Sequence, residues 1–259
     1  MRATRGWLMR ATLVSLVVVA LAGCGPSGAA GSAASPTATP IPTPPQPTAT
    51  LAVPWRTVTF TASDGVRLGG TIYGSGTTGV ALSHQSDGTQ NQWAGFARHL
   101  AANGYMALAF DFRGHGVSAK PADVSKEDVD LRAAIRFLRA QGATRIALMG
   151  ASLGGSVTLR VAATESVAAV ATLSAVTFMP TQEVTDDTIK AIEAPKLFIN
   201  SELDKDASAT QHMYDVAPPP KQIHLYPGIA HGTAIFSTDY GPDLVQRLLT
   251  FMATYAPAK

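Results

Sequence analysis

Short apolar runs alternate with helix-like segments over most of the chain. Residues 57–62 and 66–73 are strand-like and flank Ser63-Asp64-Gly65, a pattern that predicts a β-hairpin. Six further apolar runs predict buried strands, at residues 79–83, 105–110, 145–149, 166–175, 196–200 and 221–226. Helical spacing predicts helices at residues 90–103, 125–141, 153–163 and 242–253, with Ser125 and Asp128 resembling a capping box. Strands separated by helices predict an α/β fold whose mostly parallel sheet is covered on both faces.

One of the predicted turns from strand to helix contains a serine between small residues. Residues 150–155 read Gly-Ala-Ser-Leu-Gly-Gly and connect an apolar strand to a helical segment. A serine on such a turn adopts a strained backbone, so its neighbours two residues away must be small, as Gly150 and Gly154 are. The helix that follows directs its N-terminus at the hydroxyl and favours developing negative charge. Ser152 is therefore the candidate nucleophile, and a merely structural turn is the alternative.

A serine hydroxyl is a weak nucleophile, so it needs a base that is itself oriented by an acid. Of six histidines, His231 is the favoured base because it lies in a glycine-flanked loop after the last predicted strand. The acid is expected after the strand at 196–200, where Asp204 is favoured and Asp206 is the alternative. Asp206 could instead cap a helix that begins near Ala207, a common duty of aspartate.

The chain resembles the α/β-hydrolase family over nearly all of residues 55–259. The order Ser152, Asp204, His231 is the order in which that family presents its serine, acid and histidine. Residues 111–118, DFRGHGVS, are similar to the family segment D-x-R-G-x-G-x-S, which is structural, so Asp111 is not a candidate acid.

Residues 81–85, ALSHQ, are similar to the family strand that normally ends in His-Gly, before a loop that supplies half of an oxyanion hole. Carried over, the resemblance implies that the backbone N–H groups of Leu153 and Ser86 are the oxyanion donors, with Gln85 as the alternative to Ser86. Gln85 stands where glycine is usual, so the loop conformation is expected to depart from the family there. An ordinary turn is the alternative reading of residues 84–88.

The resemblance also implies an α/β-hydrolase fold with an N-terminal antiparallel hairpin, helices on both faces and little or no cap. Only residues 176–195 separate the strand before the expected cap from the acid-bearing strand, enough for one short helix. Within or near this segment, Phe178, Met179 and Ile192 could form a wall beside the serine or pack in the core.

Composition and charge exclude several classes of function. The chain has 259 residues, 46% of them hydrophobic, which is ample for a core. A formal net charge of +2 without a cluster of Lys and Arg argues against nucleic-acid binding. A single cysteine excludes a disulfide framework and a cysteine-based zinc site. The expected chemistry requires no metal and no organic cofactor.

The N-terminal region differs in composition from the rest of the chain. Residues 1–23 combine arginines with an apolar run and lead into Leu-Ala-Gly-Cys, which resembles a bacterial lipoprotein signal peptide. Cys24 is the predicted lipidation site, and a plain signal peptide or membrane anchor is the alternative. Residues 24–52 are rich in Ser, Thr, Pro and Ala and are predicted to be a disordered linker. Residues 53–259 remain as one α/β-hydrolase domain.

Together these features predict a membrane-anchored, extracytoplasmic serine hydrolase of the carboxylesterase type. It is expected to act on small ester substrates through an acyl-enzyme, with no nucleic-acid partner and no prediction of its oligomeric state. Two alternatives are kept: a peptidase or amidase of the same fold, and a non-catalytic binding lipoprotein with a vestigial site.

Overall fold

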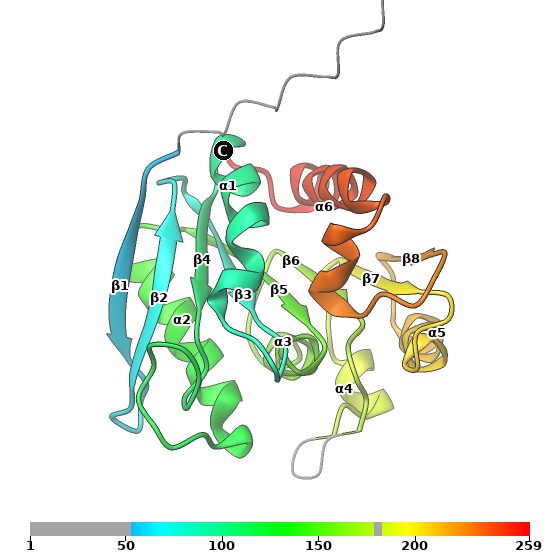
Figure 1. Cartoon of the computed structure of the whole chain (residues 1–259), viewed down its shortest axis with the longest axis horizontal. Helices are drawn as coiled ribbons and strands as arrows, with labels where there is room; N and C mark the ends of the chain where they lie inside the picture. Colours follow the sequence, from blue (N-terminus) through cyan, green and yellow to red (C-terminus); the bar gives the residue numbers. More distant parts are fainter. Residues whose placement is uncertain (1–52, 179–182) are drawn as a thin grey trace, which may run out of the picture. The chain divides into compact units, whose positions relative to one another are not determined.

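The fold begins with an antiparallel hairpin. The computed structural model describes residues 53–178 and 183–259, which belong to one compact unit, Ala49–Lys259 (Figure 1). Strands β1 (Trp55–Thr61) and β2 (Arg67–Tyr73) pair antiparallel, as predicted, and their turn contains Gly65 at φ +85°. The predicted signal peptide, Cys24, the linker and Met179 lie outside the described residues.

The described strands form one sheet in the order β1-β2-β4-β3-β5-β6-β7-β8. Strand β2 pairs antiparallel with β4, and every later neighbour pairs parallel. The predicted mostly parallel sheet is therefore confirmed. The strands after the hairpin are β3 (Thr78–Ser83), β4 (Met106–Phe110), β5 (Arg145–Ala151), β6 (Ala169–Leu173), β7 (Lys196–Ser201) and β8 (Lys221–Tyr226).

Helices cover both faces of this sheet, as Figure 1 shows. Because both of their faces are buried, the central strands β3 to β7 read as nearly continuous apolar runs rather than as alternating ones. In β4, Leu108 and Phe110 join the core on one face, while Ala107 and Ala109 join the core on the other. The helices are α1 (Ala94–Ala102) and α6 (Gly241–Tyr255) on one face, and α2 (Glu127–Ala140), α3 (Leu153–Ala162) and α5 (Ala207–Val216) on the opposite face.

Two predicted helix starts differ from the structure. The segment predicted as one helix from residue 90 begins with a 3₁₀ turn, η1 (Gln90–Trp93), before α1. The predicted capping box at Ser125 is wrong. A 3₁₀ turn, η2 (Val124–Lys126), precedes α2, and the Asp123 carboxylate accepts the Ser125 N–H at 3.0 Å. Asp123 directly precedes this turn, so its carboxylate is placed to cap the turn in place of the Ser125 hydroxyl.

The segment between β6 and β7 is short, as the resemblance implied. Its described residues contain only one helix, α4 (Asp186–Lys190), and no inserted cap. The carboxyl ends of β3, β5, β6, β7 and β8 therefore lie along one open edge of the sheet, where ligand sites form in α/β proteins. In the described part of the chain, no helix is both long and apolar enough to cross a membrane.

Candidate active site

Ser152 occupies a strained turn between β5 and α3. Its backbone has φ +49° and ψ −118°, a region that residues other than glycine rarely adopt and that costs about 1–3 kcal/mol. The turn is held because the Ser152 N–H donates to the Leu173 carbonyl of β6 at 2.8 Å. Such strain is found where the surrounding structure fixes a functional side chain.

Two glycines make this turn possible for a specific steric reason. A β-carbon at Gly150 would collide with the backbone of Gly154, and one at Gly154 would collide with the carbonyl oxygens of Ser83 and His84. The first glycine lets strand and helix approach each other, and the second lets the helix approach the loop after β3. The small residues expected from the sequence are thus required by backbone contact.

His231 and Asp204 come together although 27 residues separate them. The Nδ1 atom of His231 lies 2.8 Å from Oδ2 of Asp204, whose side chain is almost fully buried. The other Asp204 oxygen, Oδ1, accepts the Asp206 N–H at 2.9 Å and the Asn200 amide at 3.3 Å. These contacts fix the carboxylate, and a carboxylate acceptor favours the tautomer in which Nδ1 carries the proton.

Asp206, the alternative acid, lies farther from the histidine. Its Oδ2 is 4.0 Å from His231 Nδ1 and 2.6 Å from Nζ of the exposed Lys205. Asp206 does stand before α5, but its side chain forms no capping hydrogen bond, so the expectation that its carboxylate caps this helix is wrong. Because the shorter contact belongs to Asp204, the geometry favours it over Asp206 as the partner of the histidine.

Two buried polar residues that sequence reasoning missed support this pair. Ser174, at φ +50°, accepts the N–H of Gly232 at 2.8 Å and donates to Oδ1 of Asn200 at 2.6 Å. The Asn200 amide nitrogen in turn reaches Asp204, so one network connects the histidine loop with the acid. The available signal was a polar residue at or next to the end of each predicted strand, at 166–175 and 196–200, which the pattern alone reads as part of the strand.

The histidine loop also approaches the serine turn. A β-carbon at Gly232 would lie 3.4 Å from that of Ala151, the residue before Ser152. Gly232 directly follows His231, so neighbours of the predicted base and nucleophile are in contact. Within residues 53–178 and 183–259, neither the Ser152 hydroxyl nor His231 Nε2 forms a hydrogen bond, which leaves both free for a ligand.

The loop after β3 contains the two candidates for the second oxyanion donor. The Gln85 N–H donates to Oε1 of Gln92 at 3.3 Å, whereas the Ser86 N–H has no acceptor among the described residues. Leu153 is the first residue of α3, where N–H groups lack partners within the helix. Ser86 and Leu153 therefore offer free N–H donors, whereas the Gln85 N–H is already engaged.

His84 anchors this loop as a structural residue. It is fully buried, its Nε2 accepts the Phe112 N–H at 3.1 Å, and its Nδ1 lies 2.7 Å from the Gln85 carbonyl. These partners require a neutral ring that is protonated on Nδ1. Burial lowers the pKa of His84, which favours the same neutral form.

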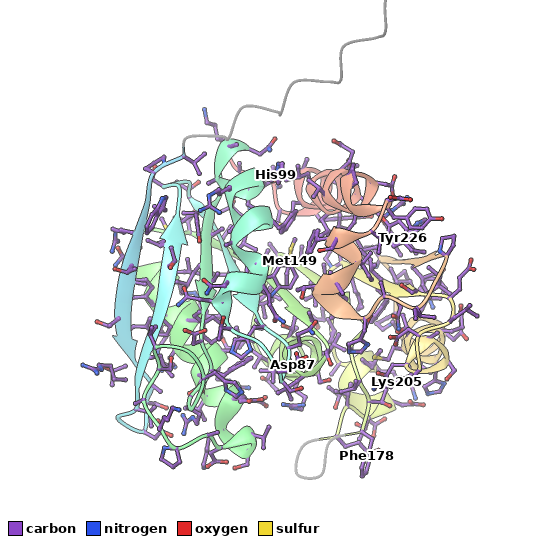
Figure 2. The ribbon with its side chains drawn as sticks, in the orientation of Figure 1. Asp87, His99, Met149, Phe178, Lys205 and Tyr226 are labelled. Atoms are coloured by element: carbon purple, nitrogen blue, oxygen red, sulfur yellow. The ribbon has the colours of Figure 1, made fainter. Side chains whose placement is uncertain are left out.

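An open cleft of about 410 Å³ borders the serine. Its lining includes Ser86, Ser152, Leu153, Phe178, Lys205 and Asp206. Figure 2 shows Asp87, Lys205 and Phe178 at the same end of the domain, with His99 at the opposite end. The Phe178 residue is 74% exposed and contributes to the cleft wall, whereas Ile192 is fully buried in the core.

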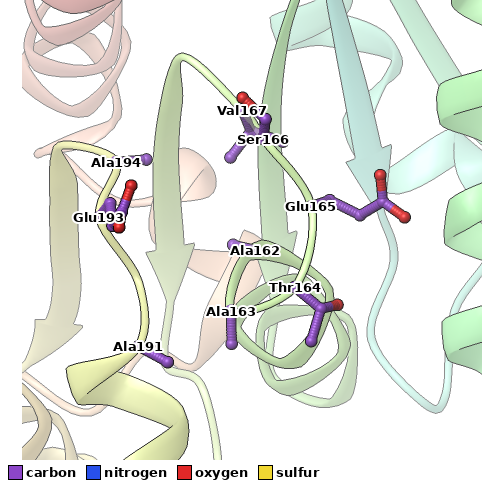
Figure 3. A pocket seen from close by; sticks show the side chains of 9 residues that line it. All are labelled: Ala162, Ala163, Thr164, Glu165, Ser166, Val167, Ala191, Glu193 and Ala194. Carbon is purple, nitrogen blue, oxygen red and sulfur yellow. The ribbon is translucent and has the colours of Figure 1, made fainter.

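A second, smaller cavity of about 260 Å³ lies beyond the other end of α3 (Figure 3). It is lined mainly by small residues and by Glu165 and Glu193, and its lining contains Ser166 but no histidine. A serine there lacks the base that nucleophilic catalysis requires. The cleft beside Ser152 is the candidate active site because it is lined by the strained serine turn and by Ser86 and Leu153, whose N–H groups have no acceptor among the described residues.

The acidic residues and the histidine beside the cleft are also candidate metal ligands. Among the described residues, only Asp204, Asp206 and His231 form a group of three whose candidate ligand atoms lie within 4.8 Å of one another. However, the Nδ1 of His231 is already engaged with Asp204 at 2.8 Å. This nitrogen thus fits a hydrogen bond to Asp204 better than a metal bond, for which it would have to be deprotonated.

Comparison with known proteins gives the family. The sequence profile of the alpha/beta hydrolase fold matches residues 79–214, more than half of the chain. The chain belongs to the alpha/beta hydrolase family. The match runs from within β3 into α5, and it includes the Ser152 turn and Asp204 of this family member. A search of curated proteins found no significant match.

Solved structures with this hydrolase fold include several esterases. An esterase of Pyrococcus furiosus is similar with a TM-score of 0.69 at 21% identity, covering 79% of this chain and 94% of that one. The esterase domain of a Rhodothermus marinus protein has a TM-score of 0.63 at 24% identity, covering 78% and 99%. An esterase of Exiguobacterium antarcticum has a TM-score of 0.65 at 15% identity, covering 75% and 98%. At these identities the likeness establishes the shared fold.

Proposed function

We propose that the protein is a serine hydrolase that cleaves small carboxylic esters through an acyl-enzyme. The observation that carries the proposal is the 2.8 Å contact between His231 and Asp204, next to a cleft lined by the strained Ser152 turn. A neutral histidine that donates from Nδ1 can accept a proton at Nε2, which is the task of a general base.

The proposed reaction assigns one role to each residue. Ser152 Oγ attacks the ester carbonyl while His231 Nε2 takes its proton, and Asp204 stabilises the imidazolium. The N–H groups of Leu153 and Ser86 stabilise the negative charge on the carbonyl oxygen. The intermediate then collapses, and His231 returns the proton to the departing alcohol. Water repeats the two steps on the acyl-enzyme and releases the carboxylic acid.

Three observations favour an ester over an amide or peptide substrate. Structural relatives at TM-scores of 0.63 to 0.69 are named as esterases, although they are distant in sequence. The cleft is open and small, and the described part of the chain holds no cap or insertion that would select a peptide. Its exposed Phe178 offers an apolar surface for an acyl group. Matched ester and anilide substrates compared side by side test this choice, and faster anilide cleavage would reverse it.

The activated serine can be tested directly with a fluorophosphonate probe on the full chain. We expect stoichiometric labelling at Ser152, loss of labelling in Ser152→Ala, and strongly slowed labelling in His231→Ala. Ser166→Ala is the matched control because Ser166 is exposed and lines the cavity without a histidine. A folded protein that resists labelling would instead support the non-catalytic binding lipoprotein.

We also propose that Cys24 carries a lipid that anchors the domain to the extracytoplasmic face of the cell membrane. The support is the signal-like segment before the only cysteine of the chain. Cys24→Ser is expected to abolish incorporation of an alkyne-tagged fatty acid and to move the protein from the membrane to the soluble fraction. Unchanged membrane association with no incorporated lipid would favour a plain anchor.

A further inference from the structure

The Gln85 side chain leaves its own loop and contacts the loop that carries His231. Its Oε1 accepts the backbone N–H of Thr233 at 3.0 Å and the Thr233 hydroxyl at 3.2 Å. These residues are 148 positions apart in the sequence. The Thr233 residue is only 8% exposed, so the two bonds lie in a sheltered contact. On its other side, Nε2 of Gln85 donates to Oδ1 of Asp87 at 3.1 Å.

The histidine loop is shaped to receive this amide. Gly232, between His231 and Thr233, has φ +57°, a conformation that disfavours other residues. A β-carbon at Gly232 would also collide with Oε1 of Gln85. The Gly232 N–H donates to Ser174 at 2.8 Å, so the loop is held by Ser174 on one side and by Gln85 on the other.

The main chain of Gln85 is equally fixed. Its N–H donates to Gln92, and its carbonyl accepts the Gly88 N–H at 3.0 Å and contacts the buried His84 ring. The next residue is Ser86, the proposed oxyanion donor, whose carbonyl lies 3.1 Å from Nε2 of His115. The loop that contains Ser86 is thus restrained, and the side-chain amide of Gln85 extends from it to the histidine loop.

We propose that Gln85 is a positioning residue that couples the oxyanion loop to the loop of the catalytic base through Thr233. The inference rests on the proposed function and adds to it a residue that acts through Ser86 and His231 rather than on the substrate. Glycine, the usual residue at this position in the resemblance drawn from the sequence, has no side chain to form the link. Displacement of a catalytic group by about 1 Å can cost on the order of 100-fold in rate, so such a link affects turnover.

The kinetic test removes the acceptor while keeping the length of the side chain. In Gln85→Met we expect kcat for an aryl ester to fall about 10- to 100-fold with KM within about 3-fold, because alignment rather than binding is lost. Thr233→Val should show a smaller loss, and Thr233→Ser, which keeps both donors, should recover most of the activity. The control is Gln246→Met, at an exposed glutamine on α6 whose amide donates to the Thr250 hydroxyl at 3.1 Å. Equal losses in Thr233→Ser and Thr233→Val would contradict the proposed link.

A second measurement follows the link without substrate. Hydrogen–deuterium exchange of the peptide covering residues 228–236 should be faster in Gln85→Met than in wild type and unchanged in Gln246→Met. Unchanged exchange in Gln85→Met overturns the inference whether or not the wild-type protein cleaves an ester. If the wild-type protein cleaves no ester and takes no phosphonate label, the proposed function is refuted instead. In that case the exchange rates alone test the link between Gln85 and Thr233.

Discussion

Asp111 and Asp204 are two buried aspartates that follow strands of the same sheet, yet their surroundings differ in kind. Asp111 follows β4, and its oxygens accept the Gln90 backbone N–H at 2.7 Å, the Gln90 amide at 2.9 Å and the Val117 N–H at 3.0 Å. Asp204 follows β7, and one of its oxygens binds structural donors while the other contacts His231 at 2.8 Å.

The comparison shows that partners, more than residue type or burial, separate a structural carboxylate from one suited to chemistry. Among the described residues, every hydrogen-bond partner of the Asp111 carboxylate is a backbone or side-chain amide that holds its proton at ordinary pH. Asp204 instead reaches a histidine whose other nitrogen is free to exchange a proton. A carboxylate bound only to amides stabilises loops, whereas one bound to an imidazole can orient a base.

Neutralising Asp204 should have the largest effect. In Asp204→Asn we expect kcat/KM to fall about 10³- to 10⁴-fold, because an amide can stabilise the wrong histidine tautomer. The unfolding midpoint should change little, because Asn can still accept from the Asp206 N–H. Steady-state ester hydrolysis and urea denaturation measure the two effects. Asp206→Asn is the matched control and should lose less than about 5-fold; a reversed order would make Asp206 the acid.

Neutralising Asp111 should have the opposite signature. Asp111→Asn replaces one acceptor oxygen with an NH₂ group that faces N–H donors, so at least one charge-assisted hydrogen bond is lost. We expect a loss of roughly 2–3 kcal/mol in the free energy of unfolding, with kcat of the folded protein within about 3-fold of wild type. Urea denaturation beside an ester assay distinguishes the outcomes. Loss of activity at unchanged stability would break the distinction between the two aspartates.

Glu127 sharpens the comparison because it is a buried carboxyl to which the described residues offer neither an amide nor an imidazole partner. It is 1% exposed, and its Oε2 has no hydrogen bond among the described residues. Burial, with Asp130 and Asp128 nearby and Arg160 opposing, raises the pKa of Glu127 from 4.5 to about 8. Between these values the unfolded chain is ionised and the folded one protonated, so its contribution to stability is lost as pH rises through about 8.

Glu127→Gln should therefore flatten the dependence of stability on pH. We expect the variant to be close to wild type at pH 5 and more stable than it by roughly 2–4 kcal/mol above pH 8. Thermal unfolding at several pH values measures this difference. Parallel pH profiles for the two proteins would mean that Glu127 stays ionised in the fold.

Elements whose constraints are local were predictable from the sequence. The hairpin was expected because Gly65 lies in its turn, and the buried strands were expected from their apolar runs. The Ser152 turn was expected because the glycines that permit it lie two residues to either side. Helix starts were less predictable, since Asp123 and Ser125 are both competent caps two residues apart. The family resemblance added the oxyanion loop, but not the use of Gln85 within it.

The sequence by itself therefore determined the fold class, the strained serine turn and a short set of candidate acids and bases. Tertiary structure alone decided which candidates meet: that Asp204 rather than Asp206 lies nearer to His231, and that Gln85 contacts Thr233. The physical reason is one of range. Steric limits on a turn act between neighbours and leave their mark in adjacent residues, whereas hydrogen bonds of about 3 Å between distant loops depend on the order of strands in the sheet and on how each loop leaves its strand.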